Sequence, residues 1–544
     1  MGGIGRYFHT LKHLRLIQIY GRVLFRMHHP KPDLARAPQL RAHEGSFAEP
    51  AHRRPSMTAP NEFIFLNRPG SLAFGWDAPC LAKLWRYNLH YFDDLSAVAS
   101  GERKEWHKAL IERWIAGNPP SAGSGWEPYP VSLRIVNWIK WALAGNDLSP
   151  AAIHSLAVQV RWLTKRLEYH LLGNHLFANA KALVFAGAFF EGAEANAWLE
   201  RGLSILERVI DEQILSDGGH FELSTMYHAL ALEDVLDLVN ITRAFNVGDD
   251  VSKELVLRVP AMRRWLAAMC HPDGDIAFFN DAAKGIAPLP AELNAYAERL
   301  GFGAVQDPGR GLVRLDRSGY ARFADDRMTT IIDVARIGPD YLPGHAHADT
   351  LSFEMSLDGH RILVNSGTSE YGAGPERLRQ RGTPAHNTVT VDNADSSEVW
   401  GGFRVAQRAR PIAIDIVEAG ASVSIRASHD GYRRLAGRPV HVRHFEAGTA
   451  HLRINDKITG PVREAQARYH FVPGVELRPN GVGGQAIVKG RSVLNWVLEK
   501  GEGDIVSATY HPEFGISQPS FCLVVKAVEN CAIIRFEGIP LSTS

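Results

Sequence analysis

The sequence predicts a multidomain α+β protein in which an array of helical hairpins is followed by an antiparallel β-sandwich. Between about residues 81 and 300, apolar residues recur at three- and four-residue intervals, the period of helices with one buried face. After about residue 307 the chain changes to short β-prone runs separated by turn residues. Its 544 residues also exceed the size at which one hydrophobic core keeps growing. We therefore expect a helix and linker at 1–60, a helical domain at 61–306 and a β domain at 307–544.

The composition is that of an ordinary globular protein, with 45% apolar and 22% charged residues. A formal net charge of +1 excludes a protein held to nucleic acid by bulk positive charge, but leaves room for a local basic cleft. No apolar run reaches the length of about 18 residues that predicts a transmembrane helix. The four cysteines form no CxxC pair. We expect Cys522 and Cys531 to be buried thiols, with a disulfide between them as the alternative.

The first 30 residues are rich in apolar side chains, interrupted by Arg15, Gln18, Arg22 and Arg26. These interruptions break the apolar centre that a signal peptide needs, so the cytoplasm is the default location and the periplasm the alternative. The pattern predicts a basic amphipathic helix that packs on the body of the protein, and binding to a membrane surface is the alternative. Residues 30–60 then predict a linker, and 63–74 an extended segment that turns at Arg68-Pro69-Gly70.

Helical periodicity is strongest in seven segments between residues 106 and 270. They are 106–115, 131–143, 153–171, 176–190, 197–214, 230–245 and 251–270. The breaks between them are short and carry Gly, Pro, Asn and Asp. Helices of similar length with short connections predict an array of helical hairpins, either stacked as a solenoid or closed into a toroid.

The C-terminal part predicts many strands without intervening helices. The β-prone runs are 312–315, 329–335, 388–391, 412–416, 422–427, 440–445, 452–458, 467–471, 492–498 and 521–527. Such a series predicts a large antiparallel sandwich. One hairpin can be predicted in detail: a strand at 351–357, a two-residue turn at Asp358-Gly359 and a return strand at 361–365.

Histidines gather around this hairpin. His345 and His347 alternate at strand spacing, Asp349 completes an HxHxD motif, and the hairpin returns Asn365 to the same end of the sheet. His386 follows on a later strand. Imidazoles without a thiol suit zinc or a similar ion, and a hydrogen-bonded histidine cluster is the structural alternative.

The helical part offers a second group of polar residues. Asn174 and His175 precede a helix, where Asn174 could serve as its N-cap. In the loop 217–224, Ser224 or Thr225 can cap the next helix, which places Tyr227 in its first turn. Two aromatic clusters, WRYNLHYF at 85–92 and WEPYP at 126–130, suit a glycan cleft and equally suit a helical core.

Taken together, these motifs resemble the heparinase II/III family of polysaccharide lyases. The matching pieces, in the family's order, are WRYNLHYFDDL, WEPYPVSLRIVNW, LLGNHLFANAKAL, DGGHFELSTMYH, GHAHADTLSFEM and RGTPAHNTVTVD, with DSSEVWGGFRVAQRARP continuing the last. They run from about residue 84 to 411. The resemblance implies an (α/α) toroid followed by a β-sandwich, with an acidic polysaccharide cleaved between them by β-elimination at a 4-linked uronic acid.

The resemblance also implies roles. Tyr227 would be the acid, and also the base when the proton and the leaving group lie on one face of the sugar; His175 or His345 would be the base when they lie on opposite faces. The developing negative charge would be stabilised by Asn174 with His345 or an arginine. A tyrosine acting as base would need cationic neighbours that lower its pKa. The candidate substrate-binding residues are Asn88, His90, Trp126, Tyr129, Glu222, Arg377, Arg379 and Arg381.

The family has members with a zinc ion in the β domain, and His347 and His386 match two of its ligands. The third is a carboxylate where this chain has Asn365, a weaker ligand, which Asp349 could replace. Two other functions remain open: a non-catalytic protein that binds acidic glycans, and a metal-dependent hydrolase. The sequence leaves the polymer open among a heparan-like glycan, a bacterial exopolysaccharide and alginate, and it does not indicate an oligomeric state.

Overall fold

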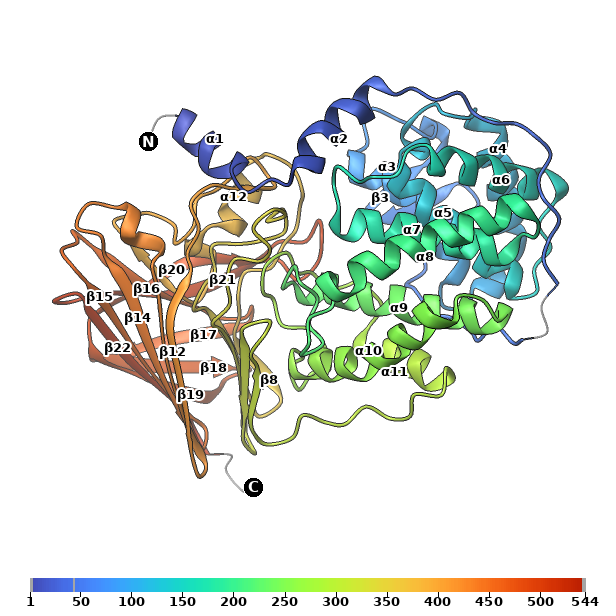
Figure 1. Ribbon diagram of the computed structural model, residues 1–544. Coiled ribbons are helices and arrows are strands. Elements are labelled where there is room, and N and C mark those ends of the chain that lie inside the picture. Colours follow the sequence, from blue (N-terminus) through green and yellow to red (C-terminus); the bar gives the residue numbers. More distant parts are fainter. Residues whose placement is uncertain (1–2, 43–44, 541–544) are drawn as a thin grey trace.

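The structure is a computed structural model that describes residues 3–42 and 45–540. A helical part and a β part lie side by side, and an N-terminal arm runs along one edge of both (Figure 1). The helices are α1 (Gly3–Leu11), α2 (Leu16–Met27), α3 (Lys83–Tyr91), α4 (Lys104–Gly117), α5 (Pro128–Leu143), α6 (Pro150–Thr164), α7 (Gly173–Phe189), α8 (Ala193–Gln213), α9 (Thr225–Phe245), α10 (Asp249–Ala268), α11 (Pro290–Arg299) and α12 (Pro375–Arg381). None of these helices combines the length and apolar character needed to cross a bilayer.

The helices from α3 to α11 form the array of helical hairpins that the sequence predicts, with one core that contains Trp114, Trp138 and Leu183. Local signals define their ends: Ser149 caps α6 ahead of Pro150, and the Ser224 hydroxyl accepts a hydrogen bond from the Tyr227 N–H at the start of α9. The helix predicted at 153–171 ends at Thr164, because Lys165 already leaves the helix as its C-cap.

Strands form three sheets in the β part. Their bounds are β4 (Gly311–Leu315), β5 (Tyr320–Ala324), β6 (Met328–Asp333), β7 (Phe353–Leu357), β8 (His360–Leu363), β9 (Val389–Val391), β12 (Pro411–Ala419), β13 (Ser422–His429), β14 (Val440–Gly448), β15 (His451–Thr459), β16 (Ala465–His470), β17 (Val475–Asn480), β18 (Gly483–Val488), β19 (Arg491–Lys500), β20 (Glu502–Tyr510), β21 (Gln518–Lys526) and β22 (Cys531–Gly538). The sheets have the orders β4-β5-β6-β7-β8, β12-β13-β14-β15-β22-β19-β18-β17 and β20-β21-β16-β9. All their pairings are antiparallel, and side chains from all three sheets share one core.

A short hairpin and a small three-stranded sheet complete the sheet structure. β10 (Val399–Trp400) pairs with β11 (Arg404–Val405), and β1 (Met57–Ala59), β2 (Glu62–Phe65) and β3 (Arg68–Ser71) form a small sheet beside the helices. The prediction of a turn at Arg68-Pro69-Gly70 is wrong. The chain turns at Leu66 and Asn67, both with positive φ (55° and 58°), and Pro69 lies in the edge strand β3, which needs no N–H there.

The predicted hairpin at 351–365 is confirmed as β7 and β8, with Asp358 and Gly359 at positive φ in its turn. All five residues of β7 are buried, including the polar ones. The reason is that both faces of this sheet are covered. Glu354 accepts hydrogen bonds from the N–H groups of Phe278 (3.1 Å) and Asn365 (2.7 Å), and His271 reaches it at 2.8 Å.

The cysteines are free thiols, with Cys522 buried and Cys531 partly buried, so the expected thiols are confirmed and the alternative disulfide does not form. The last helix of the helical part, α11, ends at Arg299, and the first strand of the β part begins at Gly311. The boundary expected between residues 306 and 307 falls in this connection.

Candidate active site

A cavity lies at the N-terminal ends of two helices. Its lining includes Asn174 from the first turn of α7 and Tyr227 from the first turn of α9, together with Tyr129, Gln213, His220 and Asp234. Asn174 is not the N-cap considered above, because Leu172 occupies that position and α7 begins at Gly173. Two helix N-termini, which carry partial positive charge, therefore meet at one cavity.

Tyr227 is one of the residues through which the two parts of the protein touch. Its ring lies over the imidazole of His345, with 3.9 Å between centroids, and its hydroxyl is 3.0 Å from the hydroxyl of Tyr371. His345 and Tyr371 both come from loops of the β part. Burial, and then the nearby Tyr371 and the negative charge of Asp281, raise the pKa of Tyr227 well above its usual value. The lowered pKa that a second role as base would require is therefore not found.

Asp281 organises the loops around His345. Its carboxylate is 2.8 Å from His345 Nδ1 and 2.8 Å from His347 Nε2, and Arg377 binds it with both terminal nitrogens. Burial alone would raise the pKa of Asp281, but the charge of Arg377 and the hydrogen bonds hold it well below its usual value. An ionised carboxylate can only accept hydrogen bonds, so His345 Nδ1 donates to Asp281, and a neutral form of the ring would present Nε2 as an acceptor.

Glu222 lies on the other side of His345. It is 2% exposed, and one of its carboxylate oxygens is 3.7 Å from His345 Nε2. Gly173 is required here, because a Cβ at that position would meet Leu342 at 2.3 Å and Glu222 at 3.2 Å. The Asn174 backbone lowers the pKa of Glu222 slightly, but burial dominates and raises it. Among the described residues, no donor makes a hydrogen bond of standard geometry to either carboxylate oxygen of Glu222.

His175 is not among the residues that line the cavity. Its ring is 4.6 Å from that of Tyr129, which does line the cavity, and its Nδ1 is 3.2 Å from a Glu168 oxygen. Burial alone would lower the pKa of His175, but the charge of Glu168 raises it. About a third of the His175 side chain is exposed.

The three candidate arginines do not face the cavity with free guanidinium groups. Arg377 is buried against Asp281, and Arg381 is buried with hydrogen bonds to the carbonyls of Ala346 and Gly402. Arg379 lies apart from them and pairs with Glu376. The expected role of these residues in binding substrate is thus corrected for Arg377 and Arg381, because protein groups already occupy their donors.

The aromatic clusters belong to the helical core. His90 is fully buried and accepts a hydrogen bond from Trp114 Nε1 (3.0 Å), and burial lowers its pKa to about 3. Trp126 is 3% exposed and donates to the carbonyl of Asn118. Asn88 donates to a carbonyl of its own helix. His90 and Trp126 are therefore core residues, whereas Asn88 is only partly buried. Of the two clusters, only Tyr129 lines the cavity.

A candidate metal centre adjoins Asp281 through His347. One ligand atom each from His347, Asp349 and His386 falls within 4.8 Å of the others, and all three residues are buried. His347 Nε2 bonds Asp281, so its Nδ1 lone pair faces His386 Nε2 at 3.3 Å. Burial lowers the pKa of His347 to about 4 and that of His386 well below its usual value, so both imidazoles are neutral. Two neutral imidazoles and a carboxylate fit a divalent ion such as zinc.

Asn365 does not complete this group. Its amide nitrogen donates to the carbonyl of Phe278 (2.9 Å), and its amide oxygen accepts from the N–H of Asn387 (3.1 Å). The side chain therefore joins two backbone segments. Asp349 stands in its place, as the alternative ligand in the sequence suggested.

Two central residues of the site, Asp281 and Tyr371, were not predicted from the sequence. Asp281 follows Asn280 in a polar pair that ends the apolar run AFF, and Tyr371 lies in the glycine-containing loop SEYGAG. A polar pair after a buried run was the only available signal. Asp281 meets His345 across 64 residues of chain, and Tyr371 meets Tyr227 across 144. Contacts at such distances along the chain cannot be read from local sequence.

Comparison with known proteins identifies the family. Residues 84–300 match the description "Heparinase II/III N-terminus", and residues 307–537 match "Heparinase II/III-like, C-terminal". A heparin-sulfate lyase of Bacteroides stercoris is 26% identical over 367 residues, which cover 57% of this chain and 54% of the relative. The chain thus spans about half the length of that curated relative.

A second relative matches more of the chain. The FtsZ-localized protein C of Caulobacter vibrioides is 24% identical over 532 residues, covering 89% of this chain and 88% of the relative. Among solved structures, a crystal structure of heparinase III superposes with a TM-score of 0.69 at 17% identity, over 86% of this chain and 80% of the other. That similarity establishes the fold, an (α/α) toroid followed by an antiparallel β domain. The chain therefore belongs to the heparinase II/III-like family.

Proposed function

We propose that this protein is a polysaccharide lyase that cleaves a 4-linked, uronate-containing acidic glycan by β-elimination in the cleft between its two parts. The observation that carries the proposal is the contact of Tyr227 with His345 beside a cavity that two helix N-termini border. The names of the heparin-sulfate lyase relatives support the same reaction class.

In the proposed reaction, His345 Nε2 takes the C5 proton of the uronate. Asp281 supports this role because it fixes the proton of the neutral imidazole on Nδ1 and stabilises the imidazolium that forms. The electron pair of the broken C–H bond forms the C4–C5 double bond, and the C4–O4 bond breaks. His175, oriented by Glu168, is the alternative base.

Tyr227 then donates its phenolic proton to the departing O4 oxygen. Its raised pKa keeps the hydroxyl protonated at neutral pH, which suits an acid and disfavours the additional role as a base. We therefore favour the division of labour between Tyr227 and His345 over a single tyrosine that performs both steps.

Negative charge develops on the uronate carboxylate as the proton leaves. No arginine of the described residues lines the cavity, so we assign the stabilisation of this charge to the Asn174 amide and to the N-termini of α7 and α9. Glu222, whose oxygens make no hydrogen bond of standard geometry among the described residues, would accept hydrogen bonds from sugar hydroxyls. A divalent ion held by His347, Asp349 and His386 would supply fixed positive charge that orders the loops carrying His345 and His386.

The test is incubation of the purified protein with a panel of uronate polymers that includes heparan sulfate, heparin, alginate and a bacterial exopolysaccharide. A lyase produces a 4,5-unsaturated sugar, so ultraviolet absorbance rises with at least one polymer. New reducing ends without absorbance would instead identify a hydrolase and contradict the proposal.

The alternative that the sequence left open, a glycan-binding protein without turnover, is separated from a lyase by the same panel. Binding to a polymer of the panel, without a rise in absorbance for any of them, would support this candidate over the lyase.

A further inference from the structure

The N-terminal arm exposes an apolar surface that the fold leaves uncovered. In α2, the side chains of Leu16, Ile19, Tyr20, Val23, Leu24 and Met27 are each at least 50% exposed. Their spacing of three and four residues places them on one face of the helix. In α1, Ile4, Tyr7, Phe8 and Leu11 repeat the pattern, each at least 51% exposed. The helix predicted to bury its apolar face against the body is thus two helices whose apolar faces point to solvent.

The opposite face of α2 is the one that docks. Gln18 donates to the carbonyl of Tyr341 (3.1 Å), Gly21 lies against His170, and the Phe25 ring is 4.2 Å from the His170 ring. These three residues repeat at the helical period, half a turn away from the exposed stripe. α2 is thus held in place by its small and polar side, which fixes the outward direction of the apolar side.

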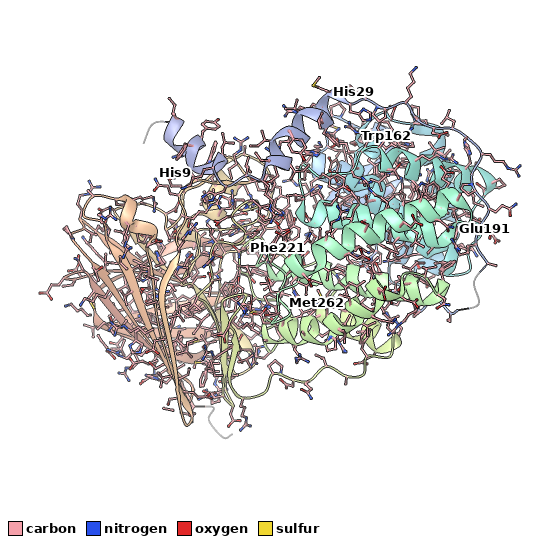
Figure 2. The ribbon with its side chains drawn as sticks, in the orientation of Figure 1. His9, His29, Trp162, Glu191, Phe221 and Met262 are labelled. Carbon is pink, nitrogen blue, oxygen red and sulfur yellow. The ribbon has the colours of Figure 1, made fainter. Side chains whose placement is uncertain are left out.

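α1 is anchored to the β part through Thr10 and through one edge of its apolar stripe, at Tyr7. The Trp400 indole donates to the Thr10 hydroxyl (3.1 Å), and the Tyr7 ring packs edge-on against it at 4.9 Å between centroids. His9 on α1 and His29 just after α2 mark the two ends of this arm along the upper edge of the molecule (Figure 2). Both helices therefore lie along one edge, which spans the helical and the β part (Figure 1).

The charge of the arm indicates which kind of partner its apolar surface binds. Residues 1–32 carry six Lys and Arg and no Asp or Glu, although the whole chain has a net charge of only +1. Arg22 and Arg26 are exposed on one flank of the apolar stripe of α2. Partial burial, and then the neighbouring charges of Arg404 and Arg26, lower the pKa of Arg22, as expected where positive charges gather. A second copy of the chain would bring two such arms together with no acidic residue from either to pair them.

We infer that the arm formed by α1 and α2 is a docking surface for an anionic lipid bilayer, in which the apolar stripes enter the interface and the flanking arginines contact lipid phosphates. Cationic helices with exposed Leu, Ile and aromatic side chains bind membrane surfaces in this way without spanning them. The proposal is independent of the catalytic assignment, because none of its residues borders the cavity.

Sedimentation with lipid vesicles tests the inference. The full chain sediments with vesicles of phosphatidylcholine mixed with phosphatidylglycerol, and remains in solution with phosphatidylcholine alone. Leu24→Glu places a charge in the apolar stripe and lowers the bound fraction at least tenfold. Its control, Leu257→Glu, makes the same change at a 73% exposed leucine on α10 and binds as the wild type does.

The electrostatic part is tested separately by the double variant Arg22→Gln and Arg26→Gln. Each lost charge weakens binding about fivefold, since a basic residue near an anionic surface contributes about 1 kcal/mol. Arg264→Gln on the exposed side of α10 is the control and changes nothing. Absence of binding by the wild type would overturn the proposal, as would variants that bind equally well. A self-association that Leu24→Glu abolishes, seen in analytical ultracentrifugation without lipid binding, would assign the surface to a second copy instead.

Discussion

Tyr227 and His345 lie face to face across the junction of the two domains, with 3.9 Å between their ring centroids. Tyr227 is held by the Ser224 cap in the first turn of α9, and His345 is held by Asp281 through its Nδ1. The proposed acid and base thus come from different domains, and their separation depends on how the domains pack.

Replacing Tyr227 with Phe removes only the hydroxyl. We expect turnover of a responsive polymer to fall about 10²- to 10⁴-fold, the usual loss when a general acid is removed. Glycan binding, measured by calorimetry with the same polymer, should remain close to that of the wild type. Tyr169→Phe removes a hydroxyl outside the cavity and serves as the control. If Tyr227→Phe kept most of its activity, the proton donor would have to be another group.

Glu222→Gln should separate stability from activity. An ionised, buried carboxylate without hydrogen-bond partners is costly, so the neutral amide should stabilise the folded protein by about 1 kcal/mol. Because the folded pKa of Glu222 is raised, wild-type stability falls as pH rises past the ordinary value of about 4.3. The gain should therefore appear at pH 8 and vanish below pH 4, as urea unfolding would measure.

The same Glu222→Gln variant should turn over substrate more slowly, with a raised KM, if Glu222 accepts hydrogen bonds from sugar hydroxyls. Glu105→Gln, an exposed position on α4, is the matched control for both measurements. A variant less stable than the wild type at pH 8 would show that Glu222 has a partner in solution.

Asp94 should contribute to stability in a pH-dependent manner. Its carboxylate accepts hydrogen bonds from Arg103 (2.8 Å) and from the backbone of Ser56 and Met57, and lies 2.8 Å from His107. Burial alone would raise its pKa, but these partners lower it to about 2. A lowered pKa stabilises the folded state above the unfolded value of about 3.9, and this contribution is lost as pH falls through about 2.

Asp94→Asn should therefore lower the free energy of unfolding by about 2 kcal/mol at pH 7, and by much less at pH 2. Chemical denaturation at the two pH values measures the difference. Asp147→Asn, at an exposed position before α6, should have no effect at either. An equal loss for Asp94→Asn at both pH values would mean that its charge is not what stabilises the fold.

The metal centre is tested by elemental analysis of dialysed protein. We expect about one zinc per chain, because His347, Asp349 and His386 provide the ligand types and closeness that the ion requires. Asp349→Asn and His386→Ala should each lose the metal, while His360→Ala, at the exposed start of β8, should keep it. If the wild-type protein contains only traces of zinc, the metal site is contradicted and the histidines form a hydrogen-bonded cluster instead.

Much of this protein follows from local sequence. The helical period between residues 81 and 300, the Asp358-Gly359 turn and the Ser224 cap each depend on neighbouring residues, so each was predictable. The cap alone places Tyr227 in the first turn of α9. His345 and His347 were expected to share one side of an extended strand, but both lie in a loop, and their contacts with Asp281 bring them together.

Tertiary structure alone decided which of those polar residues remain available. Arg377 turns inward because Asp281, almost a hundred residues earlier, needs a counterion when it is buried. His90 and Trp126 disappear into the core, and the stripe from Leu16 to Met27 faces solvent because Gln18 and Phe25 hold the other side of α2. A periodic pattern defines the faces of a helix, but only long-range contacts determine which face is buried.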